Sequence, residues 1–141
     1  MGKSTLTRGI LLVGMLALTV IFMTSCAKSK STPTPTITKI AESIVDSMAK
    51  GDFASVTTEF NATMKSQLPA LELGEVWTQV TTQAGPFKAR TGTREAQEQG
   101  YNVVYVTCQF EKSNIDIKVV FDNDKKVTGL FMVPSSAPVG R

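Results

Sequence analysis

Two hydrophobic periods divide the chain, and the change from one to the other falls near residue 87. Before that point apolar residues recur every three or four positions, which predicts amphipathic helices over residues 37–50, 53–68 and 71–84. Beyond it apolar and polar residues alternate, which predicts strands over residues 87–98, 101–111, 115–122 and 127–133. Helices followed by an antiparallel four-stranded meander predict one α+β domain over residues 37–134, with a tail over residues 135–141.

The strand over residues 101–111 is apolar on both of its faces, which is typical of a central strand covered on both sides. One face carries Tyr101, Val103, Tyr105 and Thr107. The other face carries Val104, Val106, Cys108 and Phe110. In the preceding strand we expect the side chains of Lys88, Arg90 and Arg94 to share one face. An anion site is one interpretation of this row, but we favour a solvated face or protection of a sheet edge.

Local signals also predict where the helices begin and end. Gly51 is placed to end the first helix, and Asp52 to cap the second. Asn61 is placed to restart the second helix after a break. Within the first helix, Asp46 and Lys50 have the i,i+4 spacing of an ion pair, and we interpret Glu59 as a solvated helix residue.

A separate apolar run over residues 10–23 follows the basic residues Lys3 and Arg8. As a helix this run is about 21 Å long, which is shorter than a hydrocarbon core of about 30 Å. Together these features predict a secretory signal peptide over residues 1–25. The residues Met23-Thr24-Ser25-Cys26 that end it resemble the bacterial lipobox, in which the cysteine is acylated and becomes the new N-terminus.

The lipobox resemblance implies a lipoprotein attached to membrane lipid through Cys26, on the extracytoplasmic face of the cell membrane. Two acyl chains are enough for stable anchoring. An uncleaved membrane anchor and plain secretion are the alternatives. Residues 26–36 would then be the lipidated cysteine and a tether rich in Ser, Thr and Pro, in which Pro33 and Pro35 favour extended geometry.

Composition limits the chemistry of the folded part. The chain has 15 Lys and Arg, 12 Asp and Glu, and a net charge of +3. Four of the basic residues lie within residues 1–30, which leaves 11 bases against 12 acids and a net charge of −1, so bulk charge does not favour nucleic-acid binding. There is no histidine, so the commonest general base and zinc ligand is missing, and we expect no catalytic residue, metal or cofactor. Cys108 is interpreted as a small buried apolar residue.

Residues 37–134 resemble the domain of unknown function 3887 family. The matching pieces are Lys50-Gly51-Asp52-Phe53, Phe60 with Met64-Lys65, Trp77 before Gly85-Pro86-Phe87, and the hairpin from Val119 to Leu130. The resemblance implies a cone-shaped fold like that of nuclear transport factor 2, with a curved antiparallel sheet around the helices. Relatives often carry an α/β-hydrolase domain after this module, which we do not expect in this chain.

These observations favour a membrane-anchored binding or interaction domain of unknown ligand, without catalytic activity. The apolar strand suggests that the sheet pairs with a second copy as a homodimer. The alternative is a small-molecule-binding or enzymatic domain, in which Tyr101 and Tyr105 orient a ligand beside Trp77, with Phe60 also lining the pocket. Tyr101 and Tyr105 are more typical of core aromatic residues whose polar tips reach solvent, and we favour that interpretation. A third hypothesis is an accessory to a separate α/β-hydrolase.

Overall fold

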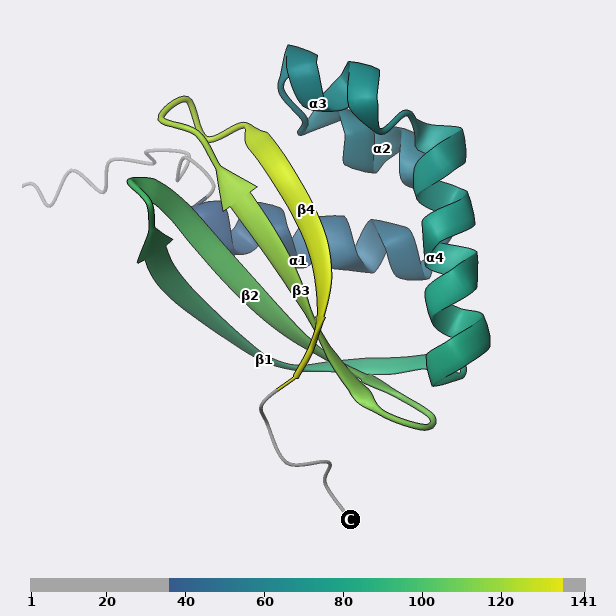
Figure 1. The fold of residues 1–141 in the computed structure, drawn as a ribbon. Helices are drawn as coiled ribbons and strands as arrows, with labels where there is room; N and C mark the ends of the chain where they lie inside the picture. Colours follow the sequence, from purple (N-terminus) through teal and green to yellow (C-terminus); the bar gives the residue numbers. More distant parts are fainter. Residues whose placement is uncertain (1–35, 136–141) are drawn as a thin grey trace, which may run out of the picture. The chain divides into compact units, whose positions relative to one another are not determined.

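The computed structural model describes residues 36–135, which form four helices followed by a four-stranded sheet (Figure 1). The helices are α1 (Ile37–Ala49), α2 (Phe53–Thr58), α3 (Ala62–Gln67) and α4 (Ala70–Ala84). The strands are β1 (Phe87–Glu98), β2 (Tyr101–Phe110), β3 (Asn114–Phe121) and β4 (Val127–Pro134). The expected α+β class and the change of period near residue 87 are therefore confirmed.

Short polar side chains begin the first three helices. The side chain of Thr36 accepts a hydrogen bond from the backbone of Lys39, that of Asp52 from Ser55, and that of Asn61 from Met64. Each cap provides a partner for a backbone N–H that the first turn of a helix leaves unpaired. The predicted break at Asn61 is confirmed, because it separates α2 from α3.

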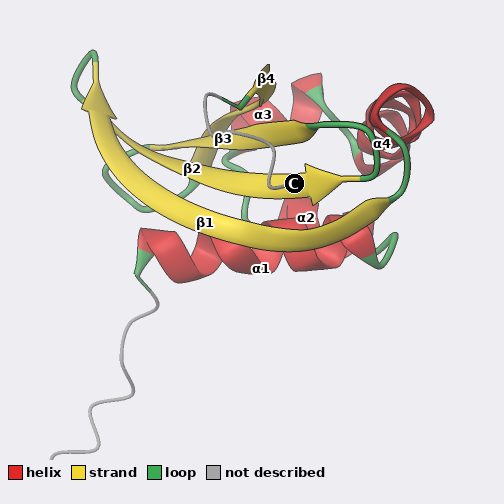
Figure 2. Cartoon of the chain, turned by 90° about the horizontal axis from the view of Figure 1, so that it is seen from below, coloured by secondary structure: helices red, strands yellow, loops and turns green. Residues whose placement is uncertain are grey.

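The strands pair antiparallel in the order β1-β2-β3-β4, so β2 and β3 are central and β1 and β4 are edges. Helix α1 packs across one face of this sheet, as Figure 2 shows from below. We call this the helix face and the opposite one the open face. Buried residues of the helix face form the core together with Ile44, Met48, Phe60, Leu73 and Trp77: Val104, Val106, Cys108, Phe110, Ile117, Val119 and Phe121.

Strand β1 contains two register shifts, which change the faces on which its basic side chains lie. They fall between Phe87 and Ala89 and between Arg90 and Gly92, and each places an extra residue in β1 opposite β2. Because side chains alternate, such an insertion moves the following residues to the other face. Arg90 therefore points to α1 and Arg94 to the open face, so the prediction that both share a face with Lys88 is wrong.

The predicted signal peptide, Cys26, the tether before Thr36 and the tail after Ser135 lie outside the described residues. None of the helices between residues 36 and 135 is long and apolar enough to cross a membrane.

Candidate functional site

The open face of the sheet is built from side chains that lie side by side on neighbouring strands. One row crosses all four strands and consists of Arg94, Tyr105, Lys118 and Phe131. The next consists of Ala96, Val103, Val120 and Gly129. Tyr101 and Phe131 are 47% and 54% exposed, which makes them two of the three exposed large hydrophobic residues that the structure describes. No helix among the described elements covers these two rings, so the open face offers aromatic surface to a partner.

Tyr105 lies at the centre of a charged network on this face. The Arg94 guanidinium lies 3.9 Å from the centroid of its ring, and the Lys118 ammonium lies 5.6 Å from it. The Tyr105 hydroxyl and the Lys118 ammonium both donate hydrogen bonds to the carboxylate of Glu98. The Lys118 hydrogen bond, followed by that from Tyr105, lowers the pKa of Glu98 below its usual value, and the Glu98 carboxylate raises the pKa of Lys118.

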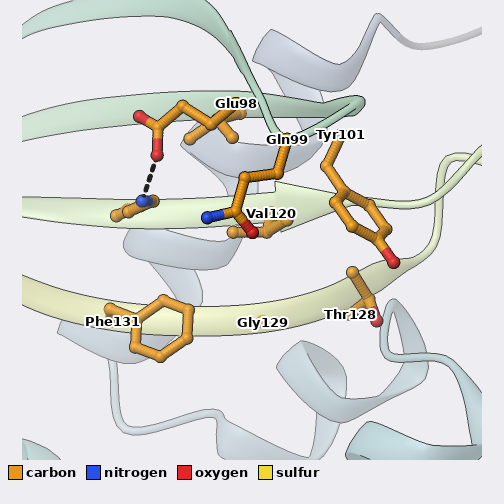
Figure 3. A pocket seen from close by; sticks show the side chains of 9 residues that line it. Glu98, Gln99, Tyr101, Val120, Thr128, Gly129 and Phe131 are labelled. Carbon is orange, nitrogen blue, oxygen red and sulfur yellow. Dashed lines mark hydrogen bonds and ion pairs between the residues drawn. The ribbon is translucent and has the colours of Figure 1, made fainter.

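A hollow of about 350 Å³ lies beside this network, between the two exposed rings. Figure 3 shows Tyr101 and Phe131 on opposite sides of it, with Val120 and Gly129 between them. Its polar lining residues are Glu98, Gln99, Lys118 and Thr128. The combination of an apolar floor, aromatic walls and a few polar groups is typical of a binding surface.

Arg94 also holds a buried carboxylate on the open face. Its Nη2 donates to Oδ2 of Asp116 at 3.1 Å, and the Asp116 residue is only 1% exposed. The other oxygen, Oδ1, makes no hydrogen bond in the structure. Arg94 therefore supplies the cation that a buried carboxylate needs.

The structure divides the four aromatic residues that the sequence placed around one pocket. Tyr101 and Tyr105 share a strand face, as expected, and that face is the open one. Trp77 and Phe60 are buried on the helix side, where they are 8% and 1% exposed. The Trp77 ring packs against Phe110 and Phe87, with centroid distances of 5.6 and 6.1 Å. The sheet therefore separates the tyrosines from Trp77, and no single pocket contains all four residues.

A second hollow of about 420 Å³ lies between α4 and β4. We call it the α4–β4 trough. The α4 wall presents Leu73, Val76, Gln79, Val80 and Gln83. The β4 wall presents Leu130, Phe131, Met132 and Val133. An adjoining hollow of about 350 Å³ shares Val80, Gln83, Met132 and Val133 and extends the trough to Pro134. None of the residues that line either hollow is charged.

Reactive groups among the described residues are few. No group of His, Cys, Asp and Glu within residues 36–135 is arranged to hold a metal ion. Burial raises the pKa of the Cys108 thiol to about 12, so this side chain is a protonated, inert core residue at neutral pH. The predicted cap role of Asp52 is confirmed, and Glu59 lies 3.9 Å from the Lys126 ammonium.

The sequence interpretation missed Glu98, Lys118 and Phe131 as residues of the open face. Alternation alone could have placed Lys118 and Phe131 there, since each lies on the open face of its strand. The α4–β4 trough had no local signal, because its two walls come from elements far apart in the chain.

Comparison with known proteins supports the family resemblance. Esterase EstD of Thermotoga maritima is 25% identical to the chain over 87 residues, which are 62% of this chain and 21% of that protein. The chain thus spans about a fifth of the length of the curated relative it matches. No solved structure matches the chain. The family profile described as protein of unknown function, DUF3887, matches residues 41–130, which is more than half of the chain, and the protein therefore belongs to the DUF3887 family.

Proposed function

We propose that this protein is an extracytoplasmic lipoprotein, anchored to the cell membrane through lipid on Cys26, that carries one non-catalytic binding domain. The observation that carries the binding role is the open face of the sheet, where Tyr101 and Phe131 are exposed around a hollow. Exposed aromatic rings on a rigid sheet provide large contact areas at a small cost in side-chain entropy. The lipobox-like residues before Cys26 support the anchor.

The partner of the open face in this proposal is a second copy of the chain. Its charged residues form two pairs, Glu98 with Lys118 and Arg94 with Asp116, so the face carries no net charge there. Two copies can therefore meet face to face without electrostatic repulsion, and the exposed rings gain burial. We further propose that the sheet and helices form a cone like that of nuclear transport factor 2, which the succession of helices and antiparallel strands supports.

Sedimentation velocity over micromolar concentrations tests the homodimer. We expect the wild-type protein to associate and Tyr101→Ser to weaken the association at least tenfold. Leu71→Ser is the matched control, because Leu71 is 79% exposed on α4, outside the open face. A wild-type protein that stays monomeric throughout this range contradicts the proposed dimer.

Metabolic labelling with palmitate tests the lipid anchor. The wild-type protein should incorporate the label and fractionate with membranes, and Cys26→Ala should lose the label while the folded domain persists. Continued labelling of the Cys26→Ala variant would show that the acyl chain is attached elsewhere, and it would remove the proposed anchor.

A second candidate function is that of an accessory to a separate α/β-hydrolase. The similarity to part of an esterase supports it, although the chain matches only about a fifth of that protein. Adding the purified chain to an esterase from the same cells should then change the KM for ester substrates. An unchanged KM and kcat at saturating concentrations of the chain would contradict this candidate.

In a third, small-molecule variant of the proposal, Tyr101 and Tyr105 contact a ligand in the open-face hollow.

A further inference from the structure

The two edges of the sheet differ sharply in how they are protected. Strand β1 carries basic and acidic side chains along its length and two register shifts, both of which discourage pairing with another strand. Strand β4 is eight residues long, has the sequence VTGLFMVP, contains no charged residue and has one register shift, at Thr128 near its start. An uncharged edge strand is the kind of edge to which another strand adds.

A pairing with the β4 edge already begins within the chain. The backbone N–H of Val127 donates to the carbonyl of Glu59 at 2.9 Å, and the N–H of Asn61 donates to the carbonyl of Val127 at 2.9 Å. Phe60 and Val127 thereby form an isolated parallel bridge. Beyond Val127, no backbone partner on this edge is found among residues 36–135. The outward backbone groups of β4 from Thr128 to Pro134 are therefore available, over a length of roughly 20 Å.

The α4–β4 trough lies along this edge and not on one face of the strand. It is lined by four consecutive residues of β4, Leu130 to Val133. Since consecutive side chains of a strand point to opposite faces, a hollow that contacts all four must run beside the backbone. A molecule in the trough would thus meet the free N–H and C=O groups of β4 directly.

Helix α4 forms the wall of the trough opposite β4 and limits which partners can reach the edge of the sheet. Helix α4 runs alongside β4 (Figure 1), and its residues Val76 and Val80 provide apolar contacts in the trough. Because the helix stands beside the edge, it obstructs a second whole sheet, and we therefore consider a single extended segment as the partner. Gln79 and Gln83 are exposed on the same wall, one turn apart, and no side-chain hydrogen bond to another described residue is found for either. Their amides can pair with the outer edge of an inserted strand.

We propose that the α4–β4 trough binds an extended, uncharged polypeptide segment, which adds to β4 as a fifth strand of the sheet. Backbone hydrogen bonds to β4 supply the main attraction, and apolar side chains at alternate positions of the segment contact α4. The uncharged lining selects against charged segments, because a charged group placed there loses its hydration without gaining a partner. This inference rests on the proposed binding function and names a class of partner and a second surface for it.

The experiment is a selection of twelve-residue random peptides displayed on phage against the full chain in lipid nanodiscs. We expect the enriched peptides to alternate apolar residues over five or six central positions that lack charge. The tightest peptide is then synthesised with a fluorophore, and its Kd is measured by anisotropy. Gln79→Lys, which brings an exposed charge to the trough wall, should weaken binding at least tenfold. Thr78→Lys brings the same charge to the neighbouring exposed position of α4, outside the trough, and should change the Kd less than twofold.

N-methylation of the peptide distinguishes strand addition from simple apolar insertion. Methyl groups on alternate amides block one edge of the peptide, so one of the two methylated sets should lose at least tenfold in affinity and the other should bind nearly as the parent does. Equal affinities for both sets, an undiminished affinity for Gln79→Lys, or no enriched peptide would each overturn the inference. If the selection yields no peptide but dodecanoate binds to the protein, the inference is also overturned, and the ligand of the trough is then an acyl chain.

The Tyr101→Ser dissociation experiment separates this result from the proposed binding function. If no peptide binds but the open face still mediates association, only the trough inference fails. If neither peptide binding nor association is observed, the binding function fails with it.

Discussion

The guanidinium of Arg90 on β1 forms a bidentate ion pair with the carboxylate of Asp46 on α1. The Nε of Arg90 donates to Oδ1 at 2.7 Å, and the Nη2 donates to Oδ2 at 3.1 Å. Glu42, one turn earlier on α1, lies 3.6 Å from Nη1 of the same guanidinium. The hydrogen bond that Arg90 donates to Asp46 raises the pKa of Arg90 above its ordinary value. This contact ties the first helix to the edge strand that carries the two register shifts.

A double-mutant cycle should detect this contact as a favourable coupling between Arg90 and Asp46. We expect Arg90→Ala and Asp46→Ala to be less than additive by about 0.5–1 kcal/mol, because the pair is bidentate but partly exposed to solvent. The coupling should shrink in 1 M NaCl, which screens such charges. Urea unfolding followed by the fluorescence of Trp77, the single tryptophan, measures each corner of the cycle. Strict additivity in low salt would show that the ion pair contributes nothing to folding.

Gly85, between α4 and β1, should not tolerate a side chain. Its φ is 82° and its ψ is 179°, a region that residues other than glycine rarely occupy. A Cβ at this position would also lie 2.8 Å from the Cβ of Glu111. We expect Gly85→Ala to lower the free energy of unfolding by at least about 2 kcal/mol.

Gly92 is the matched control for Gly85. It lies within β1, and a Cβ there would meet no atom within 4 Å. Gly92→Ala should be neutral or slightly stabilising, because alanine loses less backbone entropy on folding than glycine. Equal effects of the two substitutions in urea unfolding would contradict the conformational argument.

Substitutions of Arg94 and Asp116 test whether Arg94 stabilises the buried carboxylate of Asp116. Arg94→Met leaves the Asp116 carboxylate, 1% exposed, without its cation, and we expect a loss of about 2 kcal/mol in the free energy of unfolding. The double variant Arg94→Met/Asp116→Val removes the charge as well and should recover most of that loss. A double variant as unstable as Arg94→Met alone would show that packing of the Arg94 side chain over Tyr105, and not the buried charge, is what matters.

Periodicity alone was enough to predict the α+β class, the order of the elements and the two faces of β2. Both faces of β2 are apolar, but residues two apart on a strand share a face, which was enough to assign Val104 and Val106 together. The faces of Arg90 and Arg94 could not be predicted in the same way, since their assignment depends on register shifts that only the pairing with β2 reveals. Gly92 follows one of these shifts, but glycine also occurs in regular strands, so it does not identify a bulge by itself.

The candidate sites depend on tertiary arrangement to a greater degree. The hollow on the open face needs Tyr101 and Phe131 on strands that are not sequence neighbours. The trough needs α4 to stand beside β4, which follows from the packing of Trp77 against Phe110 and Phe87. No local sequence pattern encodes the position of α4 relative to β4, because that position results from how the large aromatic rings pack in the core.

The buried thiol of Cys108 should make the protein less stable at alkaline pH. Burial raises its pKa to about 12, whereas the thiol of the unfolded chain has a pKa near 9. Below pH 9 both states are protonated, so the thiol adds no pH dependence. Between pH 9 and 12 only the unfolded state loses its proton, and the free energy of unfolding falls by about 1.4 kcal/mol per pH unit. We expect a loss of about 2 kcal/mol at pH 10.5 from this group.

Cys108→Val isolates this contribution, because valine is apolar, similar in size and cannot ionise. The difference in stability between wild type and Cys108→Val, measured by urea unfolding at pH 8 and pH 10.5, should shift by about 2 kcal/mol in favour of the variant. Lysine and tyrosine residues that titrate in the same range affect both proteins and cancel in the comparison. In a Cys26→Ser background, a disulfide reagent should leave Cys108 unmodified at pH 8 until urea unfolds the domain. Rapid modification without urea, together with parallel pH profiles, would show that the thiol is accessible and that its pKa is not raised.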